Sequence, residues 1–235
     1  IVVGAYQFTT GPGKAYIFQT DDGGATYGQV AKLTASDAED DDYFGWSVAI
    51  DGDTVVVAAP LDDDDGGKSG AVYVFRTRDD GATYGQVAKL TASDAASNDE
   101  FGGSVAIDGA TIVAGARYDD DDGSNSGSVY VFRTSDGGAT YGQVAKLTAS
   151  DAAANDLFGS SVAIAGDTVA ISGGDSVYIF RTTDGGGTWS QVEKLVASDG
   201  VSIGRPAISG DVVVAGASGD DSIAYNAGSV YVFHT

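Results

Sequence analysis

Short hydrophobic runs alternate along the whole chain with clusters of Gly, Asp, Asn and Ser. One stretch contains four such runs: "FGGSVAI" at 101–107, "TIVAGA" at 111–116, "SVYVFR" at 128–133 and "YGQVAKLTA" at 141–149. They are rich in the β-branched and aromatic residues that favour strands, and turn-forming residues bound them. The i, i+3, i+4, i+7 spacing of an amphipathic helix is absent. The pattern predicts four strands and no helix.

The polar positions indicate how these strands are covered. The runs 101–107 and 111–116 are nearly continuous in small and β-branched residues, which predicts strands covered on both faces. The run 141–149 alternates, so Lys146 and Leu147 point to opposite faces, as in an outer strand with one side in water. The Asp-Gly pair between the first two runs predicts a tight hairpin, because Gly supplies a positive φ.

The four-run pattern recurs along the chain. The tyrosine of an Ala/Val-Tyr-Ile/Val-Phe tetrad stands at positions 16, 73, 130, 178 and 231, with spacings of 57, 57, 48 and 53. A period near 55 fits the four-stranded blade of a propeller. We therefore expect an all-β protein, a β-propeller of four-stranded antiparallel blades in a single domain over 1–235. The repeats are expected at about 1–36, 37–93, 94–150, 151–198 and 199–235.

The first and last repeats lack a strand. The chain begins with the second strand of a repeat, at 1–5, and stops after a third strand, at 230–233. An open array leaves apolar blade faces exposed, which stacked repeats tolerate poorly. We therefore expect further repeats beyond these residues.

Composition excludes several classes of partner and site. The chain has 34 acidic and 12 basic residues, a formal net charge of −22, which disfavours nucleic acid and anionic membrane surfaces. Cysteine is absent, so neither a disulfide framework nor a thiolate metal site is possible. No apolar run reaches the roughly 18–20 residues of a membrane span, so direct membrane insertion is not expected.

The stretch Phe44–Pro60, "FGWSVAIDGDTVVVAAP", resembles the FG-GAP repeat of integrin α-subunit propellers and their relatives. The Phe-Gly pair recurs at Phe101 and Phe158 and weakens to Ile203-Gly204, and the terminal proline is kept only at Pro60. This resemblance implies a propeller, usually of seven blades, so that five repeats would be a fragment of the ring. It also implies an extracellular or cell-surface location and a role in adhesion or another interaction.

A second motif links the third and fourth strands. Thr134-x-Asp136-x-Gly138-x-Thr140-Tyr141 is similar to the Asp-box, S/T-x-D-x-G-x-T-W/Y, of sialidases and many other propellers. An aspartate in such a hairpin can accept backbone N–H groups of its own turn, so its expected role is structural. The four structural aspartates are Asp22, Asp79, Asp136 and Asp184.

The remaining acidic residues gather in two kinds of link. Antiparallel strands alternate in direction, so the second-to-third and fourth-to-first links should share one end of the sheets. Carboxylates beside Asn and Ser oxygens are ligands that Ca²⁺ prefers, and Ca²⁺ is the expected cofactor. The alternative is that these runs are solvated turns. The integrin cation loop, D-x-D-x-D-G, would stand between the first and second strands, where this chain has a tight turn. The candidate ligands are Asp62, Asp63, Asp64, Asp65, Asp119, Asp120, Asp121, Asp122, Asp220 and Asp221.

Catalytic constellations are not evident. The single histidine, His234, stands next to the last residue, a poor place for the base of a catalytic triad. Arg76, Arg133 and Arg181 follow equivalent third strands and are expected to pair with acidic hairpins rather than to form a sialidase arginine cluster. No pair of acids stands out as acid and nucleophile. We therefore expect no catalytic residues and no enzyme activity.

Several aromatic residues accompany the acidic links, namely Tyr43, Trp46, Tyr118 and Tyr225. Packing between blades is the expected role, and stacking on a sugar is the alternative. The sequence thus predicts a secreted or cell-surface, non-catalytic interaction or structural module with a protein or glycan ligand. Two alternatives stay open: a carbohydrate-binding, lectin-like propeller, and a self-associating unit of an extracellular filament or sheath.

Overall fold

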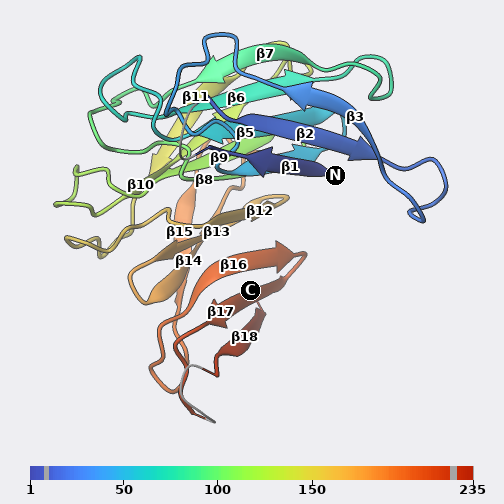
Figure 1. Cartoon of the computed structure of the whole chain (residues 1–235). Helices are drawn as coiled ribbons and strands as arrows, with labels where there is room; N and C mark the ends of the chain where they lie inside the picture. The colour runs from blue at the N-terminus through green and yellow to red at the C-terminus, as the bar shows by residue number, and fades with distance from the viewer. Residues whose placement is uncertain (8–10, 223–226, 235) are drawn as a thin grey trace.

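The computed structural model describes residues 1–7, 11–222 and 227–234, which form strands, turns and loops and no helix (Figure 1). The strands form five antiparallel sheets, and each sheet consists of strands that are consecutive in the chain. The first sheet is β1 (Val2–Ala5), β2 (Lys14–Gln19) and β3 (Gly28–Leu33). The second is β4 (Val48–Asp51), β5 (Thr54–Ala59), β6 (Ala71–Arg76) and β7 (Gly85–Leu90), and the third is β8 (Ser104–Asp108), β9 (Thr111–Ala116), β10 (Ser128–Arg133) and β11 (Gly142–Leu147). The fourth is β12 (Val162–Ala165), β13 (Thr168–Gly173), β14 (Ser176–Arg181) and β15 (Ser190–Leu195), and the fifth is β16 (Gly204–Ser209), β17 (Val212–Ala217) and β18 (Ser229–His234).

The predicted all-β class and the blade-like repeat are confirmed. Each internal sheet has four strands in chain order, and the first and fifth sheets have three. Strands β9 and β10 have the predicted bounds, but β8 begins at Ser104 rather than Phe101. Gly102, with a φ of 90°, turns the chain there, and Phe101 enters the core instead of the ladder. The fourth strand is shorter than predicted. The sequence predicted 141–149, whereas β11 covers Gly142–Leu147.

Each sheet packs on the next one in the chain. The first strands of successive sheets lie side by side, β4 against β8, β8 against β12, and β12 against β16, while β1 contacts β4. Figure 1 shows the sheets succeeding one another from the blue N-terminal sheet to the red C-terminal one. Among the described residues, no helix is long and apolar enough to cross a membrane.

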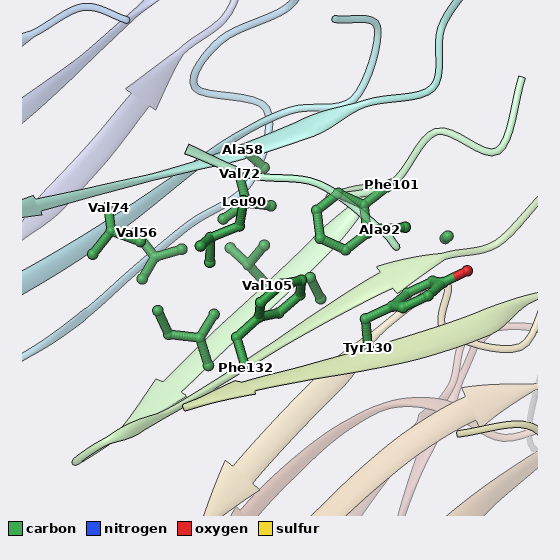
Figure 2. Packing of buried hydrophobic residues seen from close by; sticks show 13 residues of the cluster. Val56, Ala58, Val72, Val74, Leu90, Ala92, Phe101, Val105, Tyr130 and Phe132 are labelled. Atoms are coloured by element: carbon green, nitrogen blue, oxygen red, sulfur yellow. The ribbon is translucent and has the colours of Figure 1, made fainter. Parts of the chain in front are cut away.

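The core consists of separate layers between neighbouring sheets. Between the second and third sheets, aliphatic side chains such as Val72 and Val74 face the rings of Phe101, Tyr130 and Phe132 (Figure 2). The Phe101 ring meets the Tyr130 ring nearly edge-on, with centroids 5.5 Å apart and an interplanar angle of 82°. Burying one such ring contributes roughly 1.5–3 kcal/mol. Phe44 and Phe158 are equally buried at the neighbouring junctions.

Backbone hydrogen bonds join the links of neighbouring sheets. The segment before β8 donates to the β5–β6 link, with Phe101 N 2.9 Å from Ser69 O and Asn98 N 2.9 Å from Gly67 O. One repeat later, Phe158 N lies 2.9 Å from Ser126 O. These bonds hold the second-to-third and fourth-to-first links together at one end of the sheets, as strand parity predicts.

Two outer faces of the array stay uncovered by the described residues. Val230 and Val232 of β18 are 68% and 59% exposed, whereas the equivalent Val72 and Val74 are fully buried. Ile1 and Val3 are exposed in the first sheet. The apolar pattern is therefore the same in every sheet, and only the presence of a neighbouring sheet changes the burial.

A substitution at Gly127 tests the close contact between the β9–β10 link and the segment before β12. Its φ is 82°, and a Cβ built there would lie 2.2 Å from the carbonyl oxygen of Phe158. Gly127→Ala should lower the free energy of unfolding by about 2–4 kcal/mol, since backbone overlap adds to the cost of a positive φ. Gly109→Ala is the matched control, because φ is 54° and nothing lies within 4 Å of that Cβ. Its expected loss is about 1 kcal/mol. Equal losses in urea unfolding would show that the contact is unimportant.

Candidate functional site: the acidic face

The acidic face is the end of the sheets formed by the β5–β6, β9–β10 and β17–β18 links and by the segments that lead into β4, β8 and β12. All ten predicted metal ligands lie in the β5–β6, β9–β10 and β17–β18 links. Asp62, Asp119 and Asp220 are buried, each 3% exposed. The exposed members of the set are Asp63, Asp64, Asp65, Asp120, Asp121, Asp122 and Asp221.

A lysine lies among the aspartates of the second sheet. Lys89 on β7 places its Nζ 2.9 Å from an Asp37 oxygen, 2.9 Å from Asp62 and 2.5 Å from Asp64. The buried Asp62 also accepts a hydrogen bond of 2.6 Å from the Tyr73 hydroxyl. The ammonium stands 5.4 Å from the centre of the Tyr73 ring, within cation–π distance. Asp37 lies in the link between the first and second sheets and Lys89 lies in the second sheet, so the cluster fastens that link to the second sheet.

The third sheet repeats this arrangement. The Nζ of Lys146 lies 2.7 Å from Asp94 and 3.0 Å from Asp119, and it also contacts Asp121. The Tyr130 hydroxyl donates to Asp119 at 2.7 Å. In the fourth sheet the β13–β14 link is short, and Lys194 retains a single ion pair, 2.6 Å to Asp151.

These contacts move the pKa values of both partners. Burial alone would lower the pKa of Lys89, but hydrogen bonds to Asp64, Asp37 and Asp62 raise it above its ordinary value. Burial opposes ionisation of Asp37, and the hydrogen bonds from Lys89 and Tyr73 outweigh it and lower its pKa. Burial and the hydrogen bond to Asp62 raise the pKa of Tyr73. The raised pKa of Lys89 keeps its ammonium protonated at neutral pH, and the lowered pKa of Asp37 keeps that carboxylate ionised.

The clusters have the spacing of a metal site. One carboxylate oxygen from each of Asp37, Asp62 and Asp64 lies within 4.8 Å of the others, and the same holds for Asp94, Asp119 and Asp121. A hard divalent cation prefers such oxygens. However, the lysine ammonium already occupies hydrogen-bonding distance of all three carboxylates. These two clusters therefore do not fit a resident metal ion while the lysine is in place.

Sequence reasoning named Asp62, Asp64, Asp119 and Asp121 but missed the other members, Asp37, Asp94, Lys89 and Lys146. A signal was present, because "KLTASD" at 32–37, 89–94 and 146–151 places a lysine and an aspartate five residues apart in three repeats. The structure does not bring Asp220 into such a cluster among the described residues. Asp220 accepts the backbone N–H of Ser222 at 2.8 Å.

Asp42 is a buried carboxylate that forms no ion pair with a lysine or arginine of the described residues. It is 5% exposed and accepts the backbone N–H of Glu39 at 2.7 Å. Burial, reinforced by the charges of Asp62, Glu39 and Asp63, raises the pKa of Asp42 to about 6. It borders a cavity of about 300 Å³ whose other acidic lining residues are Glu39, Asp40, Asp41 and Asp63. Negative charge is thus concentrated at this point of the acidic face.

The four predicted structural aspartates lie at the opposite end, in the third-to-fourth hairpins. Asp136 accepts the Thr140 backbone N–H at 2.9 Å and the Thr140 hydroxyl at 2.6 Å. The Thr134 hydroxyl donates to the same carboxylate at 2.7 Å. These hydrogen bonds, the Thr140 hydroxyl first, lower the pKa of Asp136. The same set of contacts surrounds Asp22, Asp79 and Asp184.

The prediction that Arg76 pairs with the carboxylate of an acidic hairpin is wrong. Arg76 ends β6 and donates from Nη1 to the backbone carbonyl of Gly137, in the hairpin of the next repeat. Within the described ranges, neither Arg76 nor Arg133 lies within ion-pair distance of a carboxylate. The Arg76 guanidinium packs on Gly138, where a Cβ would lie 2.6 Å from Nη1. The arginine therefore joins adjacent hairpins through a carbonyl.

Aromatic side chains border the acidic face near the second sheet. A cavity of about 200 Å³ is lined by Tyr43, Trp46, Pro60, Leu61, Lys68, Glu100 and Arg117. Tyr118 lies beside it, 4.6 Å below the Arg117 guanidinium. Tyr225, the fourth aromatic residue singled out from the sequence, lies outside the described residues. His234 is exposed at the end of β18, away from any acidic cluster of the described residues.

The sequence matches the family described as "FG-GAP repeat" over residues 27–75, 84–132, 141–180 and 189–233, more than half of the chain. A search of curated proteins gives no match.

Solved structures share the fold at low identity. A Lactobacillus plantarum protein aligns with a TM-score of 0.59 and 16% identity over 100% of this chain and 66% of its own. A Bacteroides uniformis protein described as a putative 6-phosphogluconolactonase gives 0.59 and 15%, over 100% and 63%. U3-55K gives 0.55 and 17%, over 94% and 62%. The chain thus spans less than two thirds of these structures, and at such identity they show the fold alone.

Removing a cluster lysine should be costly. Lys89→Met leaves the buried Asp62 without its cation, and we expect the free energy of unfolding to fall by about 2–3 kcal/mol, with partial exposure reducing the effect. Lys32→Met is the matched control: Lys32 is exposed, and no carboxylate of the described residues lies within 4 Å of it. Its expected change is within about 0.5 kcal/mol. Urea unfolding that gives equal losses for both variants would contradict a role of the cluster in stability.

Asp42 should make stability depend on pH in a defined window. Its folded pKa, about 6, is above the ordinary 3.8, so the folded state binds more protons and stability falls as pH rises from about 4 to 6. Asp42→Asn keeps an acceptor for Glu39 N–H but cannot ionise. We expect this variant to be more stable than the wild type at pH 7 and similar at pH 4. A stability difference that does not change with pH would contradict the raised pKa.

Proposed function

Because this chain belongs to the FG-GAP repeat family, we propose that it is a non-catalytic interaction module of a secreted or cell-surface protein, which engages its partner through the acidic face. The observation that carries the proposal is the backbone hydrogen bonding between neighbouring links, such as Phe101 N to Ser69 O. It makes one rigid surface from loops of successive repeats. A surface pre-ordered in this way loses little conformational entropy when a partner binds.

The non-catalytic role is supported by the state of the acidic groups. Asp136 and its equivalents accept several hydrogen bonds within their own turns, and Asp62 and Asp119 are paired with lysines. General acid–base catalysis needs a group that can exchange a proton with a substrate. The likeness to the Bacteroides uniformis protein, at 15% identity, supports a shared fold and carries no activity to this chain.

The extracellular location rests on the family, whose resemblance to integrin propellers implies surface proteins. The net charge of −22 agrees with a protein that stays soluble in a salty medium. A partner with a basic surface would be attracted to the acidic face over about one Debye length, roughly 8 Å at physiological salt. Binding should therefore weaken as salt rises.

Calcium belongs to this proposal as a weak ligand of the exposed carboxylates. Lysine ammonium groups neutralise Asp62 and Asp119, so Ca²⁺ is not needed to compensate these buried charges. The neighbouring Asp63, Asp65, Asp120 and Asp122 are exposed and are not bound to the cluster lysines. Extracellular modules of this kind bind Ca²⁺ with dissociation constants of about 10⁻⁴–10⁻³ M.

A calorimetric titration with CaCl₂ tests whether the exposed carboxylates of the acidic face bind Ca²⁺. The variant Asp63→Asn/Asp65→Asn/Asp120→Asn/Asp122→Asn should lose the millimolar heat signal, whereas the fold remains. Asp21→Asn/Asp80→Asn removes two exposed carboxylates at the opposite end and should leave the signal unchanged. Chelation with EDTA should shift the wild-type Tm by no more than about 2 °C. A large Tm loss with EDTA would show that Ca²⁺ is structural, against the proposal.

A further inference from the structure

We propose that the aromatic cavity beside the acidic face binds a single neutral sugar ring. The inference rests on the proposed non-catalytic function and names the ligand class of that module. The cavity, about 200 Å³, is smaller than the roughly 300–1,000 Å³ of pockets for drug-sized ligands, which suits one ring. It lies between the segment before β4, the β5–β6 link and the residues that flank β8 and follow β9.

One wall of the cavity is aromatic. The rings of Tyr43 and Trp46 are nearly parallel, with an interplanar angle of 17° and centroids 6.2 Å apart. Tyr6 packs against the Trp46 ring at 4.8 Å between centroids, and the Trp46 indole N–H donates to Gly103 O at 3.1 Å. Both contacts fix the indole before any ligand arrives. An aromatic face held in this way can stack on the C–H face of a pyranose.

Charged side chains also line the cavity. Glu100 and Arg117 form an ion pair of 3.1 Å, with side chains 21% and 32% exposed, and Lys68 also lines the cavity. Arg117 is held from its other side by the Tyr118 ring. Carboxylate oxygens and guanidinium N–H groups side by side offer acceptors and donors to neighbouring hydroxyls. A cavity that combines an aromatic platform with a paired acceptor and donor is complementary to a ring that has hydroxyl edges and an apolar face.

The repeat shows that the fold does not require these aromatic residues. The position of Trp46 is occupied by Gly103 and Ser160 in the next two repeats, and that of Tyr43 by Glu100 and Leu157. The adjoining phenylalanines, Phe44, Phe101 and Phe158, are fully buried in all three cases. The sheets therefore pack equally well without the aromatic pair. Residues that depart from the repeat at a cavity, and that the equivalent junctions do without, point to a function specific to that place.

The charge around the cavity selects among sugars. Asp40, Asp41 and Asp63 lie close by in the adjoining cavity, which shares Leu61 and Lys68 with this one. An acidic sugar would bring a further negative charge into this region. Arg117 is already paired with Glu100 and so offers less compensation to a ligand carboxylate. Neutral pyranoses are the class that the cavity should accept.

Tryptophan fluorescence gives a direct test. Trp46 and Trp189 are the only tryptophans, and Trp189→Tyr restores the tyrosine that the other hairpins carry, leaving Trp46 as the sole indole. In this background, methyl glycosides of glucose, galactose, mannose and N-acetylglucosamine are titrated, with glucuronic acid as the charged comparison. We expect a saturable change with at least one neutral sugar and at least tenfold weaker binding of glucuronic acid.

The repeat also supplies the variants. Tyr43→Leu places the residue of the fourth repeat at this site and should weaken binding at least fivefold. Trp46→Gly places the residue of the third repeat and should abolish binding measured by calorimetry. Tyr27→Leu, an exposed tyrosine at the opposite end, is the control and should bind normally. Circular dichroism and Tm confirm that each variant is folded.

Two results would overturn the sugar site: no saturable binding of any neutral sugar by a folded protein, or unchanged binding by both Tyr43→Leu and Trp46→Gly. Either leaves the acidic face and its Ca²⁺ titration unaffected, so the proposed module would stand. Release of a modified sugar from a reactive glycoside would instead overturn the non-catalytic role, while it would support the site itself.

Discussion

An apolar side chain inserted between successive sheets, a phenylalanine at three junctions and Ile203 at the fourth, is the contact on which the rest of the structure depends. Phe44, Phe101 and Phe158 are fully buried, and each meets the tyrosine and phenylalanine of the sheet that follows it in the chain. The glycine after each phenylalanine turns the backbone, so the ring leaves the strand and enters the layer between sheets. The same turn brings the preceding segment against the link of the neighbouring repeat. The same contact therefore packs the core between two sheets and joins the links that form the acidic face.

Two buried carboxylates at this surface, those of Asp62 and Asp119, receive a counter-charge from lysines of the outer strands. Lys89 and Lys146 reach Asp62 and Asp119 across the face of a tyrosine ring. An ammonium on a strand is always present, whatever the composition of the medium, whereas a weakly bound Ca²⁺ follows its concentration. A chain with a net charge of −22 in this way places a cation beside Asp62 and Asp119, while its exposed loops stay acidic.

The sequence predicted what depends on local pattern and missed what depends on contact between repeats. Strands β9 and β10 could be located to the residue, because apolar runs and turn residues bound them. The pairing of Lys89 with Asp37 spans 52 residues and forms only once the link before β4 lies beside β7. The sequence also predicted a carboxylate partner for Arg76. In the structure Arg76 donates to a backbone carbonyl 61 residues away, in the next repeat. Comparison of the repeats position by position could have found the lysines, and it does identify Trp46 as an exception.

Among the described residues, the main contacts of each sheet are with its neighbours in the chain, so no single element holds all the sheets together. A force applied to its two ends would act on one junction after another and not on the whole core at once. Sheets would detach in steps, each absorbing work as its phenylalanine is withdrawn, and each could return when the tension ceases. An array built this way would therefore lengthen in steps under tension.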